Sequence, residues 1–263
     1  MAALKGVHSE VFSNSSFQTS QTPDKFTKEF QPGGTLTLLC ENWSSRVIEK
    51  GTDPYGLGRW SHVTLGGRRS KRILIVTAYR VSCELAGPMT ATMQQFCNIS
   101  RAQKNQPTTD RPRPQHQMIM DLQAWLEAEV NTGYKIILSI DANEEYKPGK
   151  GNIIPLSYKE GNHIINSNHD GTISTLCHSC GLVDPHTTLQ TDLPPPPTYI
   201  RGNSRLDYIF ISQTLLHSVE RAGILPYNSV FEGDHRPCYL DFSAISLFQE
   251  NDYPLAPLAH RGL

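Results

Sequence analysis

Short apolar runs separated by glycine, proline and polar turns dominate the hydrophobic pattern of this chain. Residues 35–39, 60–65 and 73–79 form three such runs after the Pro-Gly-Gly at residues 32–34. Runs of this length are typical of β-strands, and the β-branched, uninterrupted third run predicts a central buried strand. The charged stretch 66–72 predicts a hairpin turn between the second and third runs.

Helical spacing follows farther along the chain. Met118, Leu122 and Leu126 lie four residues apart and Asn-Thr-Gly at residues 131–133 ends the pattern, which predicts an amphipathic helix. We expect further strands at residues 135–140, 205–211 and 237–242, helices near residues 89–99, 170–180 and 212–222 (the last capped by Ser212), and loops at residues 107–114, 146–169 and 194–197. Interleaved strands and helices predict an α/β (α+β) fold on mixed sheets.

Three parts of the chain differ in composition. Residues 1–32 are rich in Ser, Thr, Gln and Asn and predict a poorly ordered arm, residues 33–243 carry the periodic elements of one domain, and residues 244–263 form a tail. The sequence has 263 residues, with 24 Lys and Arg against 25 Asp and Glu, so we exclude a globally basic nucleic-acid coat protein.

Cellular context follows from what the sequence lacks. Its apolar runs are shorter than the roughly 18–20 residues that cross a bilayer, and the first residues have neither secretory nor transit character. Six cysteines in so long a chain indicate reduced, intracellular thiols. We expect Cys177 and Cys180, three positions apart on a predicted helix, to face the core.

Three groups of polar residues carry candidate chemistry. Asp141 and Asn143 end an apolar strand, Asp207 lies within another, and Asp234 and His235 precede a third. A buried carboxylate is costly unless it is paired, and an imidazole acts as a base at one nitrogen when a carboxylate holds the other. We therefore expect Asp207 and His235 to pair across neighbouring strands.

Each group also has a purely structural interpretation. Asp141 alone could be a turn residue or an N-cap, Asp207 could pair with Arg205 or another arginine, and His235 could be an ordinary surface or hydrogen-bonded histidine. The combination favours a catalytic site.

The motifs at residues 75–79 (IVTAY), 141–145 (DANEE), 205–208 (RLDY) and 233–237 (GDHRP) resemble, in order and spacing, the endonuclease/exonuclease/phosphatase superfamily. The overall spacing is similar to its retroelement-associated branch. The resemblance implies a four-layer α/β sandwich, with two packed mixed sheets flanked by helices. It also implies phosphodiester or phosphomonoester hydrolysis that depends on Mg²⁺ or Mn²⁺.

The resemblance also implies roles for individual residues. Asp141 would orient or deprotonate the attacking water, Asn143 would hold the phosphate, and His235, oriented by Asp207, would stabilise the developing charge. By the same resemblance Asp234 would help to hold the metal ion and Tyr79 would hydrogen-bond the phosphate.

One departure from the superfamily concerns its first two strands, the second of which ends in a Gln-Glu pair that supplies a metal ligand. No such strand precedes residue 33, and Glu10 lacks apolar neighbours. We expect these strands and the ligand to be absent, as in a truncated element, a gene-model fragment or a degenerate copy. A catalytically impaired remnant with at most nucleic-acid binding is therefore one alternative, and a phosphatase acting on a small phosphorylated ligand is another.

Arg68, Arg69, Lys71 and Arg72 form the densest positive cluster of the chain. Such a cluster could bind a DNA backbone, and a solvated turn is the alternative. The expected partner is DNA, with no membrane and no haem or nucleotide cofactor. The expected location is intracellular, and the nucleus if the protein acts on DNA.

Overall fold

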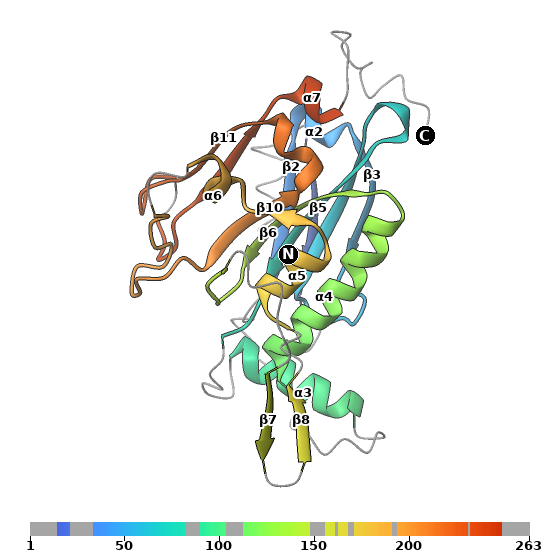
Figure 1. Ribbon diagram of the computed structural model, residues 1–263. Helices are drawn as coiled ribbons and strands as arrows, with labels where there is room; N and C mark the ends of the chain where they lie inside the picture. Colours follow the sequence, from blue (N-terminus) through green and yellow to red (C-terminus); the bar gives the residue numbers. More distant parts are fainter. Residues whose placement is uncertain are drawn as a thin grey trace.

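A six-stranded mixed sheet forms the centre of the computed structural model, with strand order β3-β4-β5-β6-β10-β9 (Figure 1). Its strands are β3 (Val47–Thr52), β4 (Trp60–Gly66), β5 (Arg72–Tyr79), β6 (Lys135–Asp141), β9 (Leu182–Val183) and β10 (Asp207–Ser212). Strands β5 and β6 pair in parallel, and the other neighbours pair antiparallel. The structure describes residues 15–21, 34–82, 90–103, 113–147, 156–160, 163–167, 171–190, 194–230 and 232–248.

Helices cover one face of this sheet (Figure 1). They are α4 (Pro114–Asn131) and α5 (Ile173–Ser179), with α3 (Ala91–Gln103) packed against α4. Leu74 and Val76 of β5 are buried there in one cluster with Leu122 and Leu126 of α4. Apolar side chains with the two-residue period of the strand thus pack against apolar side chains with the 3.6-residue period of the helix in one layer.

Two small sheets lie on the opposite face. One pairs β1 (Ser15–Ser20) with β2 (Thr35–Cys40), and the other pairs β11 (Val219–Ile224) with β12 (Cys238–Phe242). Strand β2 contacts β4 and β5, whereas β12 contacts β10. A second apolar cluster, with Leu39, Ile73, Ile137 and Phe248 among its members, fills this side.

Short elements complete the fold. They are α2 (Glu41–Ser44), the turn η1 (Arg68–Ser70), α6 (Pro185–Leu189), η2 (Gln213–Ser218), α7 (Ala244–Phe248), and a separate hairpin of β7 (Leu156–Glu160) and β8 (His163–Ser167), seen at the bottom of Figure 1. Among the described residues, no helix combines the length and apolar character needed to cross a bilayer.

The α/β class and the main elements predicted from the sequence are confirmed. The run at residues 73–79 is the central strand β5, the turn at residues 66–72 joins β4 to β5, and the periodic apolar residues form α4. Cys177 and Cys180 are buried, as expected. The second packed sheet is present as two separate two-stranded sheets.

The helix predicted at residues 212–222 is wrong. Residues 213–218 form η2, and the chain then continues as strand β11. Ser212 makes no capping hydrogen bond to η2, because its Oγ accepts the buried backbone N–H of Ile136 at 2.8 Å. Tertiary contacts therefore override the local capping signal.

Structure also appears where the sequence predicted none. Strand β1 lies within the predicted arm, α7 lies within the predicted tail, and β7 and β8 lie within the predicted loop. The polar sequence of β1 hides the strand, which exists because its backbone pairs with β2 over six residue pairs. Leu247 and Phe248 of α7 are buried in the second apolar cluster.

Truncation of Leu122 should destabilise the fold, because this side chain is fully buried between α4 and the sheet. We expect Leu122→Ala to lower the free energy of unfolding by about 2–5 kcal/mol in urea denaturation. The matched control is Leu189→Ala, because Leu189 is 47% exposed and its truncation should cost about 0.5 kcal/mol or less. Equal losses in both variants would contradict this assignment of the core.

Candidate active site

Strand register brings three predicted site residues into one row at the end of the central sheet. Tyr79 lies opposite Asp141 in the parallel pair of β5 and β6, and Asp207 lies opposite Asp141 in the antiparallel pair of β6 and β10. Directly opposed residues point to the same face of a sheet. The three side chains therefore share the face that carries the two small sheets.

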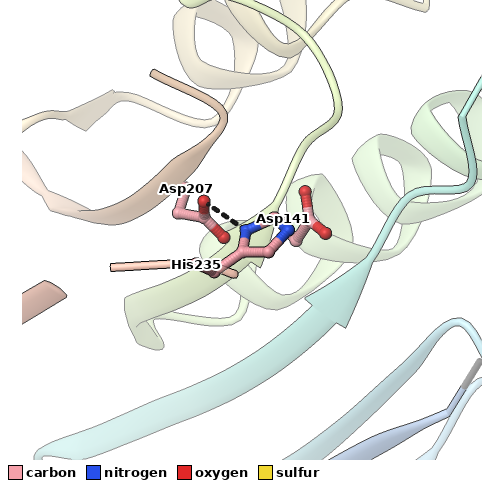
Figure 2. A group of neighbouring side chains, drawn as sticks. All are labelled: Asp141, Asp207 and His235. Carbon is pink, nitrogen blue, oxygen red and sulfur yellow. Dashed lines mark hydrogen bonds and ion pairs between the residues drawn. The ribbon is translucent and has the colours of Figure 1, made fainter. Parts of the chain in front are cut away.

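His235 completes the group from a different segment of the chain. Its backbone forms an isolated β-bridge with Tyr199, and its Nδ1 atom lies 2.8 Å from Oδ2 of Asp207. Figure 2 shows the imidazole between the carboxylates of Asp207 and Asp141, and possible ligand atoms of these three residues all lie within 4.8 Å of one another. The predicted pairing of Asp207 with His235 is present in the structure.

Burial and a neighbouring like charge change the acidity of Asp141. Burial contributes most and the charge of Asp207 adds to it, so the pKa of Asp141 rises to about 6, although His235 partly opposes this shift. A carboxyl group with a pKa in this range can accept a proton near neutral pH.

The other two groups are also shifted in ways that suit catalysis. The hydrogen bond to Asp207 raises the pKa of His235, and burial opposes this rise. Burial, followed by the charge of Asp141, raises the pKa of Tyr79. The imidazole is therefore readily protonated, while the phenol keeps its proton and can donate a hydrogen bond.

Asn143 lies beside this group in a strained turn. Its φ angle of 46° is in the left-handed region, and its backbone N–H donates to Oδ1 of Asp141 at 3.2 Å. Its side-chain Nδ2 donates to the backbone oxygen of Arg80 at 2.7 Å. This bond fixes the amide plane and leaves the second Nδ2 hydrogen for another acceptor.

Asp234 lies next to the site residues and is not one of the group formed by Asp141, Asp207 and His235. It is exposed and lies outside the group that could hold a metal ion, although its charge acts on Asp141 and His235. The alternative pairing of Asp207 with Arg205 is wrong as a side-chain ion pair, because the Arg205 guanidinium binds the buried Asp184. Glu10 lies outside the described residues.

A cavity of about 380 Å³ opens beside the row of site residues. Arg236 lines it together with Tyr79, Asp141 and Asp207, and the buried Nε atom of Arg236 has no hydrogen-bond partner among the described residues. Sequence reasoning missed this residue, although its position next to His235 in the GDHRP motif could have indicated it. The guanidinium stacks over the Tyr227 ring, and its positive charge lies beside the cavity.

The four basic residues of the predicted substrate-binding cluster lie far from this row. Arg68, Arg69 and Lys71 are in or next to η1, and Arg72 begins β5, whereas Tyr79 ends it. An extended strand of this length separates the two ends by about 23 Å. Only a substrate that reaches along the sheet could contact both regions.

The donor set of the site suits a hard divalent cation. The carboxylates of Asp141 and Asp207 are close enough for the charge of one to raise the pKa of the other. Carboxylate oxygens completed by water and phosphate oxygens are the ligands that Mg²⁺ and Mn²⁺ prefer, and a cation would relieve this repulsion.

Comparisons with known proteins show the fold. No protein family and no curated protein matches the sequence. Among solved structures, the chain is similar to AP endonuclease LMAP from Leishmania major, with a TM-score of 0.51 and 18% identity over 90% of this chain and 73% of that chain. It is also similar to the catalytic domain of Xenopus laevis APE2, with a TM-score of 0.54 and 14% identity over 91% and 80% of the two chains.

A third similar structure is the human Nocturnin catalytic domain with a bound sulfate anion. Its TM-score is 0.51, with 15% identity over 92% of this chain and 77% of that chain. These neighbours are members of the superfamily that the sequence motifs resemble. At such low identity the likeness concerns the fold.

Removal of the Asp207 charge should lower the pKa of His235. In Asp207→Asn we expect it to fall towards the ordinary value of about 6.5, because the neutral amide no longer favours the imidazolium form. An NMR titration of the imidazole protons without divalent cations measures this change. The control is Asp234→Asn, since Asp234 raises this pKa least, and an equal fall in both variants would contradict the pairing.

Proposed function

We propose that this chain is a divalent-metal-dependent phosphodiester hydrolase of the endonuclease/exonuclease/phosphatase superfamily that acts on DNA. The observation that carries the proposal is the placement of Asp141 beside the hydrogen-bonded pair of Asp207 and His235. The fold that this chain shares with AP endonuclease LMAP supports it.

Two residues would act on the attacking water and the developing charge. Above its pKa of about 6, Asp141 is a carboxylate that can orient a water molecule and accept its proton. His235, held at Nδ1 by Asp207, directs Nε2 away from that bond and as an imidazolium can stabilise negative charge on the phosphorane.

Three residues would bind the phosphate. Tyr79 keeps its phenolic proton and can donate it to a phosphate oxygen, and Asn143 has an amide hydrogen free for the same purpose. The Arg236 side chain lines the cavity and adds a positive charge. Together they would place the phosphorus atom in line with the water that Asp141 holds.

A divalent cation would be held by the carboxylates of Asp141 and Asp207, with the predicted contribution of Asp234 through its exposed side chain. When bound, it would neutralise charge on the phosphate oxygens and activate the nucleophile. Mg²⁺ and Mn²⁺ both suit oxygen ligands, so metal-dependent activity should be compared with each.

The basic cluster at η1 favours DNA over a small phosphorylated ligand, because only a long polyanion can reach it from the site. A retroelement origin and a nuclear location stay predictions of the sequence resemblance.

Hydrolysis of DNA should require His235 and Asp141. With Mg²⁺ or Mn²⁺ the purified chain should nick supercoiled plasmid, and His235→Ala and Asp141→Asn should each slow this reaction by at least about a hundredfold. The rate should fall as pH decreases below about 6. The pKa of Asp141 is about 6 without a metal ion and lower beside a bound cation, and the protonated carboxyl group cannot accept a proton.

His217→Ala is the matched control, because His217 is an exposed histidine on η2 and its loss should leave nicking unchanged. If wild type and all variants are equally inert on plasmid with both metals, the catalytically impaired remnant is correct. If wild type releases phosphate from inositol phosphates and leaves plasmid intact, the phosphatase alternative is correct.

The basic cluster should matter only for long substrates. The double substitution Arg68→Ala and Arg69→Ala should weaken binding of a duplex of about 30 base pairs. These exposed side chains lie about seven base pairs from the site, so such a duplex can reach them. Binding of a short duplex that covers the site alone should be unchanged. Fluorescence anisotropy over a salt series measures both, and equal losses on the two duplexes would contradict this placement.

A further inference from the structure

Thr198 occupies an unusual position between the segments that carry the site residues. Its side chain is completely buried, directly after the run of four prolines at residues 194–197. Its Oγ1 atom accepts two backbone hydrogen bonds, from Leu206 N–H at 2.9 Å and from Asp207 N–H at 3.1 Å. One hydroxyl therefore fixes the backbone from which the Asp207 carboxylate projects.

The backbone of the same residue holds the segment that carries His235. The Thr198 carbonyl accepts the N–H of Arg236 at 2.8 Å, and Tyr199 forms the β-bridge with His235. The N–H of Ile200 then donates to the carbonyl of Asp234 at 2.9 Å. Thr198 thus ties together the backbones on both sides of the hydrogen bond between Asp207 and His235.

A third connection leads to the strand of Asp141. The carbonyl of Leu206, whose N–H is bound by Thr198, accepts the N–H of Ala142 at 2.8 Å. The segments of all three site residues are therefore linked to this threonine directly or through one hydrogen bond.

These contacts bear on the state of the imidazole. A carboxylate only accepts hydrogen bonds, so the 2.8 Å contact requires that Nδ1 of His235 carries the hydrogen. Hydrogen bonds weaken steeply when distance or angle changes, so this tautomer depends on how accurately Asp207 is placed.

We propose that Thr198 is a positioning residue, whose hydroxyl holds Asp207 where it accepts the Nδ1–H of His235. Nε2 then faces the substrate in both the protonated and the neutral imidazole, and the neutral form is kept in the Nδ1–H tautomer. The effect of Thr198 on catalysis rests on the proposed function, whereas its effect on the tautomer does not.

Thr198→Val and Thr198→Ser separate the hydroxyl from the shape of the side chain. Valine has nearly the same volume and no acceptor, whereas serine keeps the hydroxyl. The matched control is Ser212→Ala at the other end of β10, because the Ser212 hydroxyl also accepts a buried backbone N–H, that of Ile136. Ser212→Ala should lower the free energy of unfolding because a buried N–H loses its acceptor, and it should leave the site residues in place.

The tautomer is read from the ¹⁵N shifts of His235 at about pH 9, where imidazole is neutral, without divalent cations. Wild type, Thr198→Ser and Ser212→Ala should show the Nδ1–H form, and Thr198→Val should show a large fraction of the Nε2–H form. In nicking assays Thr198→Val should lower kcat about tenfold to a hundredfold with KM unchanged, and Thr198→Ser should restore it.

If Thr198→Val keeps the Nδ1–H form and matches Ser212→Ala in kcat, Thr198 is merely structural and the inference fails. Should Thr198→Val not fold, Thr198→Cys, whose thiol is a weak acceptor, is compared with the same control under the same criteria. If wild type does not cleave DNA but Thr198→Val alone changes the tautomer, the proposed function fails and the inference stands.

Discussion

The site depends on the register in which β6 pairs with its two neighbours. Asp141 at the end of β6 lies opposite Tyr79 on one side and Asp207 on the other. Because side chains alternate between the faces of a strand, a shift of one residue in either pairing would turn a member of this row to the helix-covered face. The apolar residues of β5 and β6, buried on both faces, resist such a shift and so hold the polar row at the sheet end.

This placement has an electrostatic cost that the fold must offset. Burial and the nearby carboxylate of Asp207 disfavour ionisation of Asp141, whereas the hydrogen bond to Asp207 favours protonation of His235. Both pKa values are higher in the folded protein than in the unfolded chain, so both groups stabilise the fold less as pH rises through these values. The two apolar clusters on the faces of the sheet supply the stability that permits this arrangement.

The face with the small sheets shapes access to the site. Strand β2 and strand β12 belong to separate two-stranded sheets, and the cavity lined by Arg236 lies between them, beside the row of site residues. The same face contributes Arg236, the only cationic side chain among the described residues that line this cavity. Carboxylate oxygens that could hold a metal ion therefore lie beside a guanidinium group, while the basic cluster at η1 lies at the opposite end of β5.

The sequence by itself determined the α/β class, the central strand β5 and helix α4, and it singled out Asp141, Asp207 and His235 as candidate site residues. Short-range periodicity and motif spacing can be read directly from the order of residues. Only the tertiary structure decided that Ser212 accepts a hydrogen bond from Ile136 instead of capping a helix, and that the polar run at residues 15–20 is a strand. It also decided the place of Arg236. These features depend on partners distant in sequence, and local propensity carries no information about such partners.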